Sequence, residues 1–308
     1  MDLSIVVVNW NTRQHLARCL RHVYETVGDL SFEVFVVDNA SQDRSASMVR
    51  SSFPQVRLIE NAENVGFARA NNSAIERSQG RYILLLNPDA FVGERAIEEM
   101  VGFMDEHPEA GAAGCRLRYP DGAFQLSCAS FPSLRSEAYR LFWLYKFVPR
   151  GPAMGHYGMT YDDLSDVREV DVLLGAFMLV RRQTIEDIGP LNERFFMYSE
   201  EVDWCYRMRE AGWRIYYVPL VEAVHVGGAS TDQVKAEMVL ELYKSRIAFF
   251  RQHDGALKVL LYKLLLVGAS IPRLALLPFG NLMGEETRRS ARTLWSGYWR
   301  LLRALPRL

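Results

Sequence analysis

LSIVVV, at Leu3–Val8, is the segment from which the architecture can be worked out. A run of consecutive apolar and mostly β-branched residues predicts a strand that is buried on both faces of a sheet. Phe32–Val37 and Tyr82–Leu86 have the same character, and Thr12–Val27 carries its apolar residues at helical spacing. Strands that alternate with helices in this way predict an α/β fold, with a mostly parallel sheet and helices on both faces.

The rest of the chain has less regular patterns. Residues 120–171 are rich in aromatic residues, Pro and Gly, which is typical of a functional loop or a lid. Ordered structure is expected to resume at 172–180. Helices are also predicted at 45–52, 67–79, 94–107, 200–211 and 233–252, and short strands at 56–59, 215–218 and 223–226.

Length and composition indicate a folded protein with one large domain and an appendage. The 308 residues are 49% apolar and 24% charged, which excludes a disordered chain or a coiled coil as the main class. We expect a first domain at 1–230 and a helical, basic, amphipathic region at 231–308. The four cysteines lack CxxC spacing, which predicts a reducing compartment and no cysteine-built zinc site.

Charge is unevenly distributed along the chain. Residues 256–308 hold nine Lys/Arg and two acidic residues, a net charge of +7, whereas the other 255 residues sum to −8. An acidic body with a basic, apolar tail predicts that the tail meets an anionic surface. Nucleic acid is not an expected partner.

The apolar run 256–279 has the length of a transmembrane helix, but three charges and Pro272 make insertion costly. A pair of interfacial helices, with Trp295 and Trp299 at the level of the lipid headgroups, costs less. An amphipathic homo-oligomer interface is the alternative. Because no signal peptide precedes Leu3, we expect a cytoplasmic protein bound peripherally to the inner face of the plasma membrane.

Polar side chains follow the predicted strands, where ligands bind in sheets of this kind. Asp38 follows the second strand, where its carboxylate suits a base imide or ribose hydroxyls, or simply caps a turn. Gly66 opens a helix whose N-terminus suits phosphate, with Arg69 one turn inside, although an Asn-rich helix start is the simpler interpretation. Asp89 follows a buried strand and is a candidate ligand for Mg²⁺ or Mn²⁺, or a helix cap.

Two further segments suit catalysis. Glu200, Glu201 and Asp203 lie at a predicted helix start, where the helix dipole alone would favour carboxylates. One of them could instead serve as the general base that sugar transfer to a hydroxyl requires. His225 ends a strand before two glycines and is either structural or a further metal ligand.

Taken together, these segments resemble glycosyltransferase family 2, in its rhamnosyltransferase-like branch. Each motif is weak, but seven in the same order over residues 1–230 are specific. They are 6–11 (VVVNWN), 37–43 (VDNASQD), 64–72 (NVGFARANN), 86–89 (LNPD), 175–182 (GAFMLVRR), 196–203 (FMYSEEVD) and 225–228 (HVGG).

The resemblance implies a GT-A fold, a nucleotide-sugar donor, a divalent cation (Mg²⁺ or Mn²⁺) and inversion at the anomeric carbon. Asp89 takes the last position of the family's DxD metal motif, with Asn87 at the first, and His225 matches a histidine that completes the metal shell. Glu201 takes the position of the base, with Glu200 as second choice. The implied nucleotide contacts are Val8, Asn9, Asn11, Asp38, Asn64, Arg69, Asn87 and Asp89, and the implied acceptor contacts are Gly175, Glu200 and Asp203.

The resulting hypothesis is transfer of a sugar, rhamnose by preference, from a dTDP- or UDP-sugar to a polyprenyl-diphosphate-linked or growing glycan. Residues 117–171 would shape the acceptor site. The QxxRW signature of processive synthases is absent from the sequence, so one sugar per encounter is expected. The alternatives are an inactive relative that binds glycan or acts as a scaffold, and a sugar-nucleotide pyrophosphorylase. The latter should carry a Gly-rich basic loop where Asn9–Thr12 stands.

Overall fold

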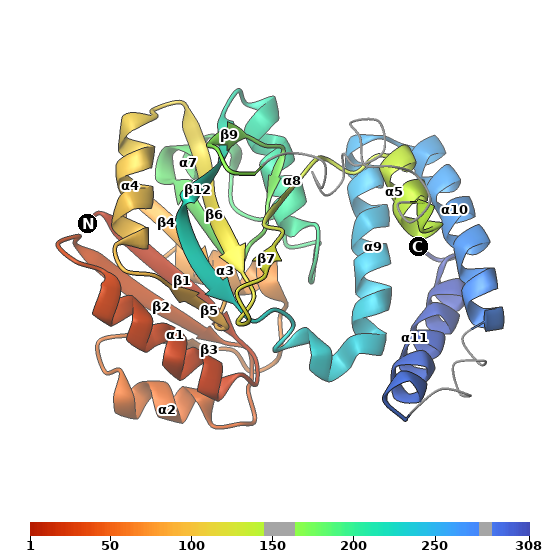
Figure 1. The fold of residues 1–308 in the computed structure, drawn as a ribbon, viewed down its shortest axis with the longest axis horizontal. Helices are drawn as coiled ribbons and strands as arrows, with labels where there is room; N and C mark the ends of the chain where they lie inside the picture. The colour runs from red at the N-terminus through yellow and green to blue at the C-terminus, as the bar shows by residue number, and fades with distance from the viewer. Residues whose placement is uncertain (145–163, 277–284) are drawn as a thin grey trace. The chain divides into compact units, whose positions relative to one another are not determined.

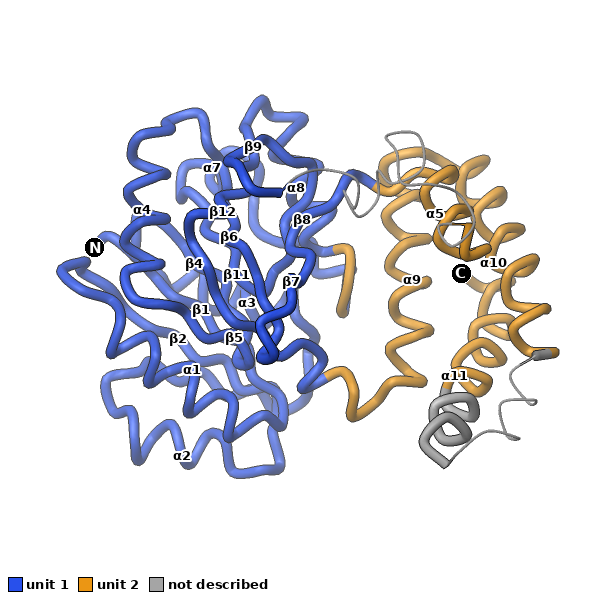
Figure 2. Tube along the Cα trace, viewed as in Figure 1, with its two compact units in different colours: residues 1–131, 162–196, 200–230 blue, residues 132–161, 197–199, 231–308 orange. Residues whose placement is uncertain are grey.

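The structure is a computed structural model that describes residues 1–144, 164–276 and 285–308 (Figure 1). The chain divides into two compact units (Figure 2). Unit 1 comprises residues 1–131, 162–196 and 200–230, and unit 2 comprises residues 132–161, 197–199 and 231–308.

Unit 1 is built on one mixed sheet whose main strands lie in the order β3-β2-β1-β4-β11-β6-β12-β5. β3, β2, β1 and β4 are parallel to one another, as are β6 and β12, while β11 and β5 run antiparallel to their neighbours. The predicted α/β fold with a mostly parallel sheet is confirmed. The strands are β1 (Leu3–Asn9), β2 (Phe32–Asp38), β3 (Arg57–Glu60), β4 (Tyr82–Leu86), β5 (Ala90–Val92), β6 (Ala110–Arg118), β11 (Phe177–Arg181) and β12 (Arg214–His225). The short strands β7 (Phe124–Gln125) and β9 (Arg168–Glu169) pair with β6 and β12, and β8 (Cys128–Ala129) pairs with β10 (Val172–Leu173).

Helices pack on the sheet through their apolar stripes. In α1, Leu16, Leu20 and Val23 are spaced by three or four residues and are fully buried against the core. Figure 1 shows α1 in front of the sheet and α3 behind it. The helices of unit 1 are α1 (Arg13–Thr26), α2 (Ser45–Ser52), α3 (Phe67–Ile75), α4 (Ala96–Glu106), α7 (Arg182–Ile188) and α8 (Glu200–Glu210).

The sequence analysis did not predict β6, although it is a central strand. Its AGAAGC segment lacks the β-branched and aromatic residues that mark strands. The small residues are required by close neighbours, because a Cβ at Gly114 would come within 2.7 Å of the Leu173 side chain. A Cβ at Gly111 would come within 2.8 Å of Trp213.

Two predicted boundaries were wrong. α3 ends at Ile75 rather than at residue 79, because side chains capture the backbone beyond it: Glu33 accepts from the Gln79 N–H and Ser4 from the Gly80 N–H. The strands expected at 215–218 and 223–226 are one strand, β12, with a register irregularity between Val218 and Glu222.

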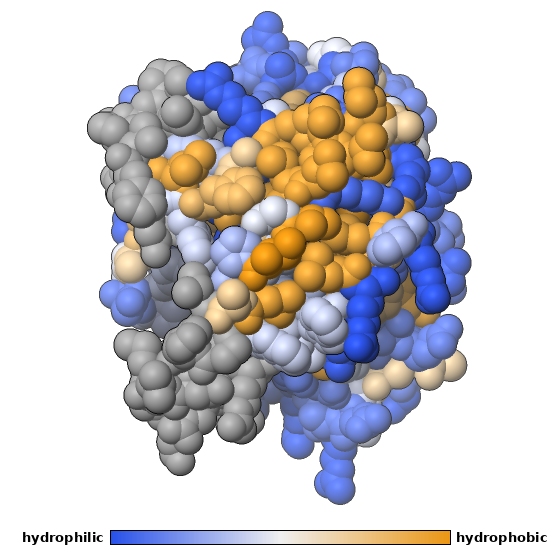
Figure 3. All heavy atoms as spheres, turned by 90° about the vertical axis from the view of Figure 1, so that its right-hand side faces the viewer, coloured by the Kyte–Doolittle hydropathy of each residue, from blue (hydrophilic) through white to orange (hydrophobic). Residues whose placement is uncertain are grey.

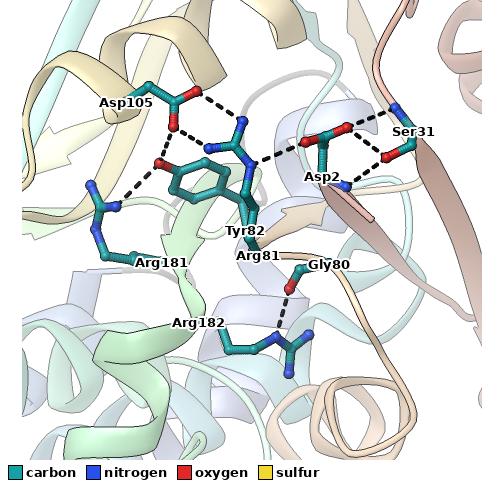
Figure 4. Close-up of polar contacts among 8 residues, drawn as sticks. All are labelled: Asp2, Ser31, Gly80, Arg81, Tyr82, Asp105, Arg181 and Arg182. Atoms are coloured by element: carbon teal, nitrogen blue, oxygen red, sulfur yellow. Dashed lines mark hydrogen bonds and ion pairs between the residues drawn. The ribbon is translucent and has the colours of Figure 1, made fainter.

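A polar cluster closes the amino edge of the sheet, opposite the strand ends singled out above (Figure 4). The Arg181 guanidinium donates to the carbonyls of Met104, His107 and Ala110 and to the hydroxyl of Tyr82. It therefore joins the end of β11 to the C-terminal end of α4. Arg182 beside it donates to the Gly80 carbonyl. Part of the 175–182 motif thus serves the fold.

Unit 2 is helical in its described parts. It contains α5 (Leu134–Leu141), a 3₁₀ turn (Thr231–Val234), α9 (Lys235–His253), α10 (Ala256–Leu276) and α11 (Glu285–Ala304). α5 lies within the segment predicted to be irregular, of which 145–163 fall outside the described residues. Residues 277–279 of the predicted apolar run do so too. Among the described residues, no helix is both long and apolar enough to cross a membrane.

A buried ion cluster joins three of these helices. Glu137 of α5 is fully buried and lies 2.7 Å from Arg140 and 3.2 Å from Arg246 of α9. Tyr262 of α10 donates to the same carboxylate at 3.1 Å. A buried carboxylate needs such partners, so these contacts fix the arrangement of α5, α9 and α10.

Candidate active site

The carboxyl ends of the parallel strands meet at one edge of the sheet in unit 1. Asn9 and Asp38 end β1 and β2 and lie opposite each other in register. Leu86 ends β4 and is followed by Asn87–Asp89. The strand directions put the carboxyl end of β12, and with it His225, at the same edge. This is the edge at which α/β sheets bind ligands.

Asp38 is held by a network of short polar contacts. The Asn9 amide donates to Oδ1 of Asp38 at 2.9 Å and to the Ser41 hydroxyl at 3.0 Å. The Ser41 backbone N–H donates to Oδ2 of Asp38 at 2.9 Å. Thr12 fixes Asn9 in turn by donating to its Oδ1 at 2.6 Å. Each carboxylate oxygen has a second lone pair, so the fixed Asp38 can still accept hydrogen bonds from a ligand.

The loops after β1 and β2 are joined to each other. Asn11, in the left-handed region at φ 52°, accepts from the Gln42 N–H through its side chain and donates from its own N–H to Ser41. Val8 is half-buried and pairs in register with Val37. Val8, Asn9, Asn11 and Asp38 therefore form one continuous rim.

The start of α3 is fixed to the segment before α8. Asn64 accepts from the Gly66 N–H at 3.0 Å, and the Phe67 N–H donates to the Phe196 carbonyl at 2.7 Å. Gly66 has φ 86°, and a Cβ there would lie 2.4 Å from that carbonyl oxygen, so only glycine fits. Gly175 packs against the Phe67 ring. These contacts bring the 64–72, 175–182 and 196–203 motifs together at the same edge.

Arg69 is exposed on α3 and forms an ion pair with Glu193 at 3.0 Å. Asn72 also donates to Glu193, at 3.1 Å. The phosphate contact predicted for Arg69 would have to replace this exposed pair, which is weak in water.

Asp89 and His225 face each other below the strand ends. Both are buried, and Nε2 of His225 lies 3.3 Å from Oδ1 of Asp89. Oδ2 of Asp89 accepts from the Gly227 N–H at 3.0 Å, so it does not cap the next helix. The His225 ring sits between two amides: Nδ1 lies 2.9 Å from Oε1 of Gln125, and Nε2 lies 3.2 Å from Nδ2 of Asn87.

The roles of the two ring nitrogens in these contacts depend on the tautomer of His225. If Nδ1 donates to Gln125, Nε2 is a lone pair that accepts from Asn87 and also faces the Asp89 carboxylate. Two lone-pair groups at 3.3 Å repel each other unless a cation lies between them. The carboxylate of this donor set fits either Mn²⁺ or Mg²⁺, and the imidazole nitrogen favours Mn²⁺ over the oxygen-preferring Mg²⁺.

A proton on Nε2 of His225 would instead donate to the Asp89 carboxylate, and it is this contact that lowers the pKa of Asp89. Burial raises the pKa of the Asp89 carboxyl, but the His225 ring and backbone N–H groups outweigh it and hold the pKa below its ordinary value. Asp89 is therefore an anion at neutral pH. Within the described part of the chain, no group of three or more His, Cys, Asp and Glu side chains is placed to hold a metal. A cation here needs further ligands from a substrate or water.

Three carboxylates begin α8. Glu200 is buried, and burial together with the neighbouring Glu201 carboxylate raises the pKa of Glu200 well above its ordinary value. Glu201 is partly exposed. Asp203 is fully buried and pairs with Arg207 at 2.9 Å, and Arg207 also binds the Ile188 and Pro190 carbonyls. Asp203 thus supports the loop before α8, and its predicted acceptor contact stays a prediction.

The sequence analysis missed the roles of Gln125 and Ser41. Ser41 stood inside the quoted 37–43 segment and Gln125 within residues 117–171, but neither residue type carries chemistry by itself. Gln125 is a buried amide on the short strand β7, close to the end of β12 at His225. To find it from sequence, one would have to know that β7 pairs with β6.

Comparisons with known proteins decide the family. The sequence model described as Glycosyl transferase family 2 matches residues 4–189. This chain belongs to glycosyltransferase family 2. The match decides against the pyrophosphorylase alternative.

Curated relatives carry related names. The chain is 31% identical over 265 residues to N-acetylglucosaminyl-diphospho-decaprenol L-rhamnosyltransferase of Mycobacterium tuberculosis, covering 82% of this chain and 85% of the relative. It is 30% identical over 170 residues to rhamnosyltransferase WbbL of Escherichia coli K12, covering 52% of this chain and 60% of that protein. The rhamnosyltransferase-like resemblance is confirmed.

A solved structure confirms the fold. Mannosyltransferase PcManGT from Pyrobaculum calidifontis, in complex with GDP-Man and Mn²⁺, aligns with a TM-score of 0.55 at 18% identity. The alignment covers 97% of this chain and 86% of that one. The predicted GT-A fold of this glycosyltransferase is therefore confirmed.

Proposed function

We propose that this glycosyltransferase moves one sugar, with inversion, from a dTDP- or UDP-sugar to a polyprenyl-diphosphate-linked acceptor, and that the sugar is rhamnose. The observation that carries the proposal is the buried Asp89–His225 pair at the carboxyl edge of the sheet. The acceptor class and the sugar rest on the mycobacterial relative, whose name gives both a decaprenol-linked acceptor and rhamnose.

The donor would bind along the rim. Asp38, held by Asn9 and Ser41, would accept hydrogen bonds from the base or the ribose. The start of α3 offers the positive end of a helix dipole to the diphosphate, while the Gly66 and Phe67 N–H groups already donate to Asn64 and Phe196. Asn64 accepts a hydrogen bond from the Gly66 N–H at this helix start. Arg69, in the first turn of α3, would bind a phosphate after its ion pair with Glu193 breaks.

Asp89 and His225 would hold Mg²⁺ or Mn²⁺, with Asn87 and Gln125 orienting the imidazole. When bound, the ion would neutralise the charge that develops on the departing diphosphate. The burial of the pair strengthens such an interaction, because water is excluded from it.

Glu201 would act as the base. It would take the proton of the acceptor hydroxyl as that oxygen bonds to the anomeric carbon, while the bond from that carbon to the diphosphate oxygen breaks. A base must first be within reach of its substrate, and Glu201 is partly exposed whereas Glu200 is buried. Glu200 lies next to Glu201 in the chain, and its raised pKa means that it would be protonated more readily than Glu201 and would be the poorer base.

The test is transfer of rhamnose from dTDP-rhamnose to a polyprenyl-diphosphate-linked sugar. Replacing Glu201→Gln should lower kcat by about 10²–10⁴-fold and leave donor binding unchanged. Glu200→Gln is the matched control and should lower it less. If Glu201→Gln keeps full activity and Glu200→Gln does not, the base is Glu200. If the wild-type protein binds neither nucleotide and transfers nothing, the scaffold alternative is favoured.

A further inference from the structure

α10 presents two opposite apolar faces. The inward face contains Val259, Tyr262, Leu266 and Ala269, all of them buried. The second face, here called the outer face of α10, is between 37% and 71% exposed at every one of its large apolar residues. At about 100° per residue, the two faces centre on nearly opposite sides of the helix. The outer face consists of Leu257, Leu260, Leu261, Leu264, Val267 and Ile271.

This surface is unusual for a water-soluble protein. Figure 3 shows a broad apolar area on the side of the molecule where α10 lies in Figure 1, with hydrophilic atoms at its borders. Soluble monomers rarely expose contiguous apolar areas of this kind unless something binds there. The outer face of α10 is therefore a docking surface.

Charge identifies what binds. α10 contains no acidic residue, and Lys263 flanks its outer face on one side, while Lys258 on the other side pairs with Asp254 at 2.6 Å. Lysines in this position can keep their ammonium groups in water beside anionic headgroups while their stems cover apolar surface. The stretch 256–308 has a net charge of +7.

α11 adds a second feature typical of an interface. Trp295 and Trp299 are both exposed, and their rings stack at 6.0 Å. The guanidinium of Arg303 lies 5.0 Å over the Trp299 ring. Exposed tryptophans beside cations are favoured at the headgroup level of a bilayer.

We propose that the outer face of α10 lies on an anionic lipid bilayer, with its leucines in the acyl boundary and Lys263 at the headgroups. α10 would lie on the surface, since no described helix qualifies to span a membrane. The proposal rests on the proposed function in one respect. A polyprenyl-linked acceptor cannot leave the bilayer, so an enzyme bound to the membrane surface meets its acceptor more often.

The experiment is co-sedimentation of the full chain with phosphatidylcholine–phosphatidylglycerol vesicles and with pure phosphatidylcholine vesicles. The wild type should pellet with the anionic vesicles and bind less as salt rises. The double variant Leu260→Glu, Leu264→Glu should lower the partition coefficient at least tenfold, since binding scales with buried apolar area. Leu220→Glu, at a leucine on β12 that is more exposed than Leu260 and Leu264, is the control and should change nothing.

Two outcomes would overturn the proposal. One is a wild type that stays in the supernatant, or a double variant that pellets as the wild type does. The other is a wild-type dimer in solution that Leu260→Glu, Leu264→Glu converts to monomer, because a second copy would then cover the face.

Transfer to a short, water-soluble acceptor separates this proposal from the proposed function. The double variant should keep that activity and lose transfer only to acceptor in vesicles. Pelleting without any transfer would contradict the proposed function alone, and transfer without pelleting would contradict the membrane proposal alone.

Discussion

At the scale of single residues, Gln125 shows how an uncharged side chain can determine the chemistry of a neighbour. Its Oε1 lies 2.9 Å from Nδ1 of His225, while Nε2 of the same ring lies 3.3 Å from Oδ1 of Asp89. Partners of this kind orient metal-binding imidazoles and raise their basicity.

Replacing Gln125→Ala should therefore weaken binding of Mn²⁺ in the presence of dTDP or UDP by about 10–100-fold. Electron paramagnetic resonance of free Mn²⁺ measures this directly, without an activity assay. Gln183→Ala, at an exposed position on α7, is the control and should bind as the wild type does. Unchanged Mn²⁺ affinity in Gln125→Ala would show that the amide does not position His225.

Glu200 should make the stability of the protein depend on pH. Its pKa is raised in the folded state by burial and by Glu201, so the folded protein holds a proton that the unfolded chain releases near its ordinary pKa. Stability should then fall as pH rises from that ordinary value through the folded pKa.

Glu200→Gln removes this titration. We expect a higher Tm than wild type at pH 8 and little difference at pH 4, measured by thermal unfolding across that range. A Tm lower than that of the wild type at pH 8 would contradict the inference that the buried Glu200 side chain is more stable when it is protonated.

At the scale of elements, the start of α3 depends on one glycine. A Cβ at Gly66 would meet the Phe196 carbonyl at 2.4 Å, whereas a Cβ at Gly122, which has nearly the same φ of 85°, would have no atom within 4 Å. Gly122→Ala should cost about 1 kcal/mol, the strain of a left-handed alanine.

Gly66→Ala should cost about 2 kcal/mol more than Gly122→Ala, because it also forces the contact between α3 and the segment before α8 apart. Urea unfolding of both variants gives the difference. Equal losses would mean that this contact is looser than the structure shows.

The amino edge of the sheet carries stability rather than chemistry. Arg181 donates to three carbonyls and the Tyr82 hydroxyl, so Arg181→Ala should lower the free energy of unfolding by about 2–4 kcal/mol. The Kd for dTDP or UDP should stay within about twofold. A large loss of nucleotide affinity in a well-folded variant would instead tie Arg181 to the site.

Elements with dense apolar patterns could be predicted from sequence, and those defined by close packing could not. β1, β2 and β4 are consecutive apolar runs and were predicted almost to the residue. The first half of β6 carries Gly111 and Gly114 because Trp213 and Leu173 lie against them, and such neighbours are far away in sequence. The early end of α3 likewise depends on Ser4 and Glu33, which belong to other strands.

At the scale of the whole molecule, the sequence indicated candidate site residues but not the side chains that hold them. His225 was named as a possible further metal ligand beside Asp89, but their closeness could not be predicted, since 136 positions separate them and the sheet brings them together. The two proposals concern different units. The residues proposed for catalysis lie in unit 1, and the outer face of α10, proposed to bind the membrane, lies in unit 2.

The most direct test of the central claim is the thermal stability of the full chain with dTDP and with UDP, each with Mn²⁺ and with EDTA. A nucleotide at about 100 times its Kd adds about 2.7 kcal/mol of stability. We predict a clear rise in Tm with one of the two nucleotides that requires Mn²⁺ and disappears in Asp89→Asn. A rise of the same size in EDTA, or in Asp89→Asn, would contradict the assignment of Asp89 and His225 to a cation that holds the diphosphate.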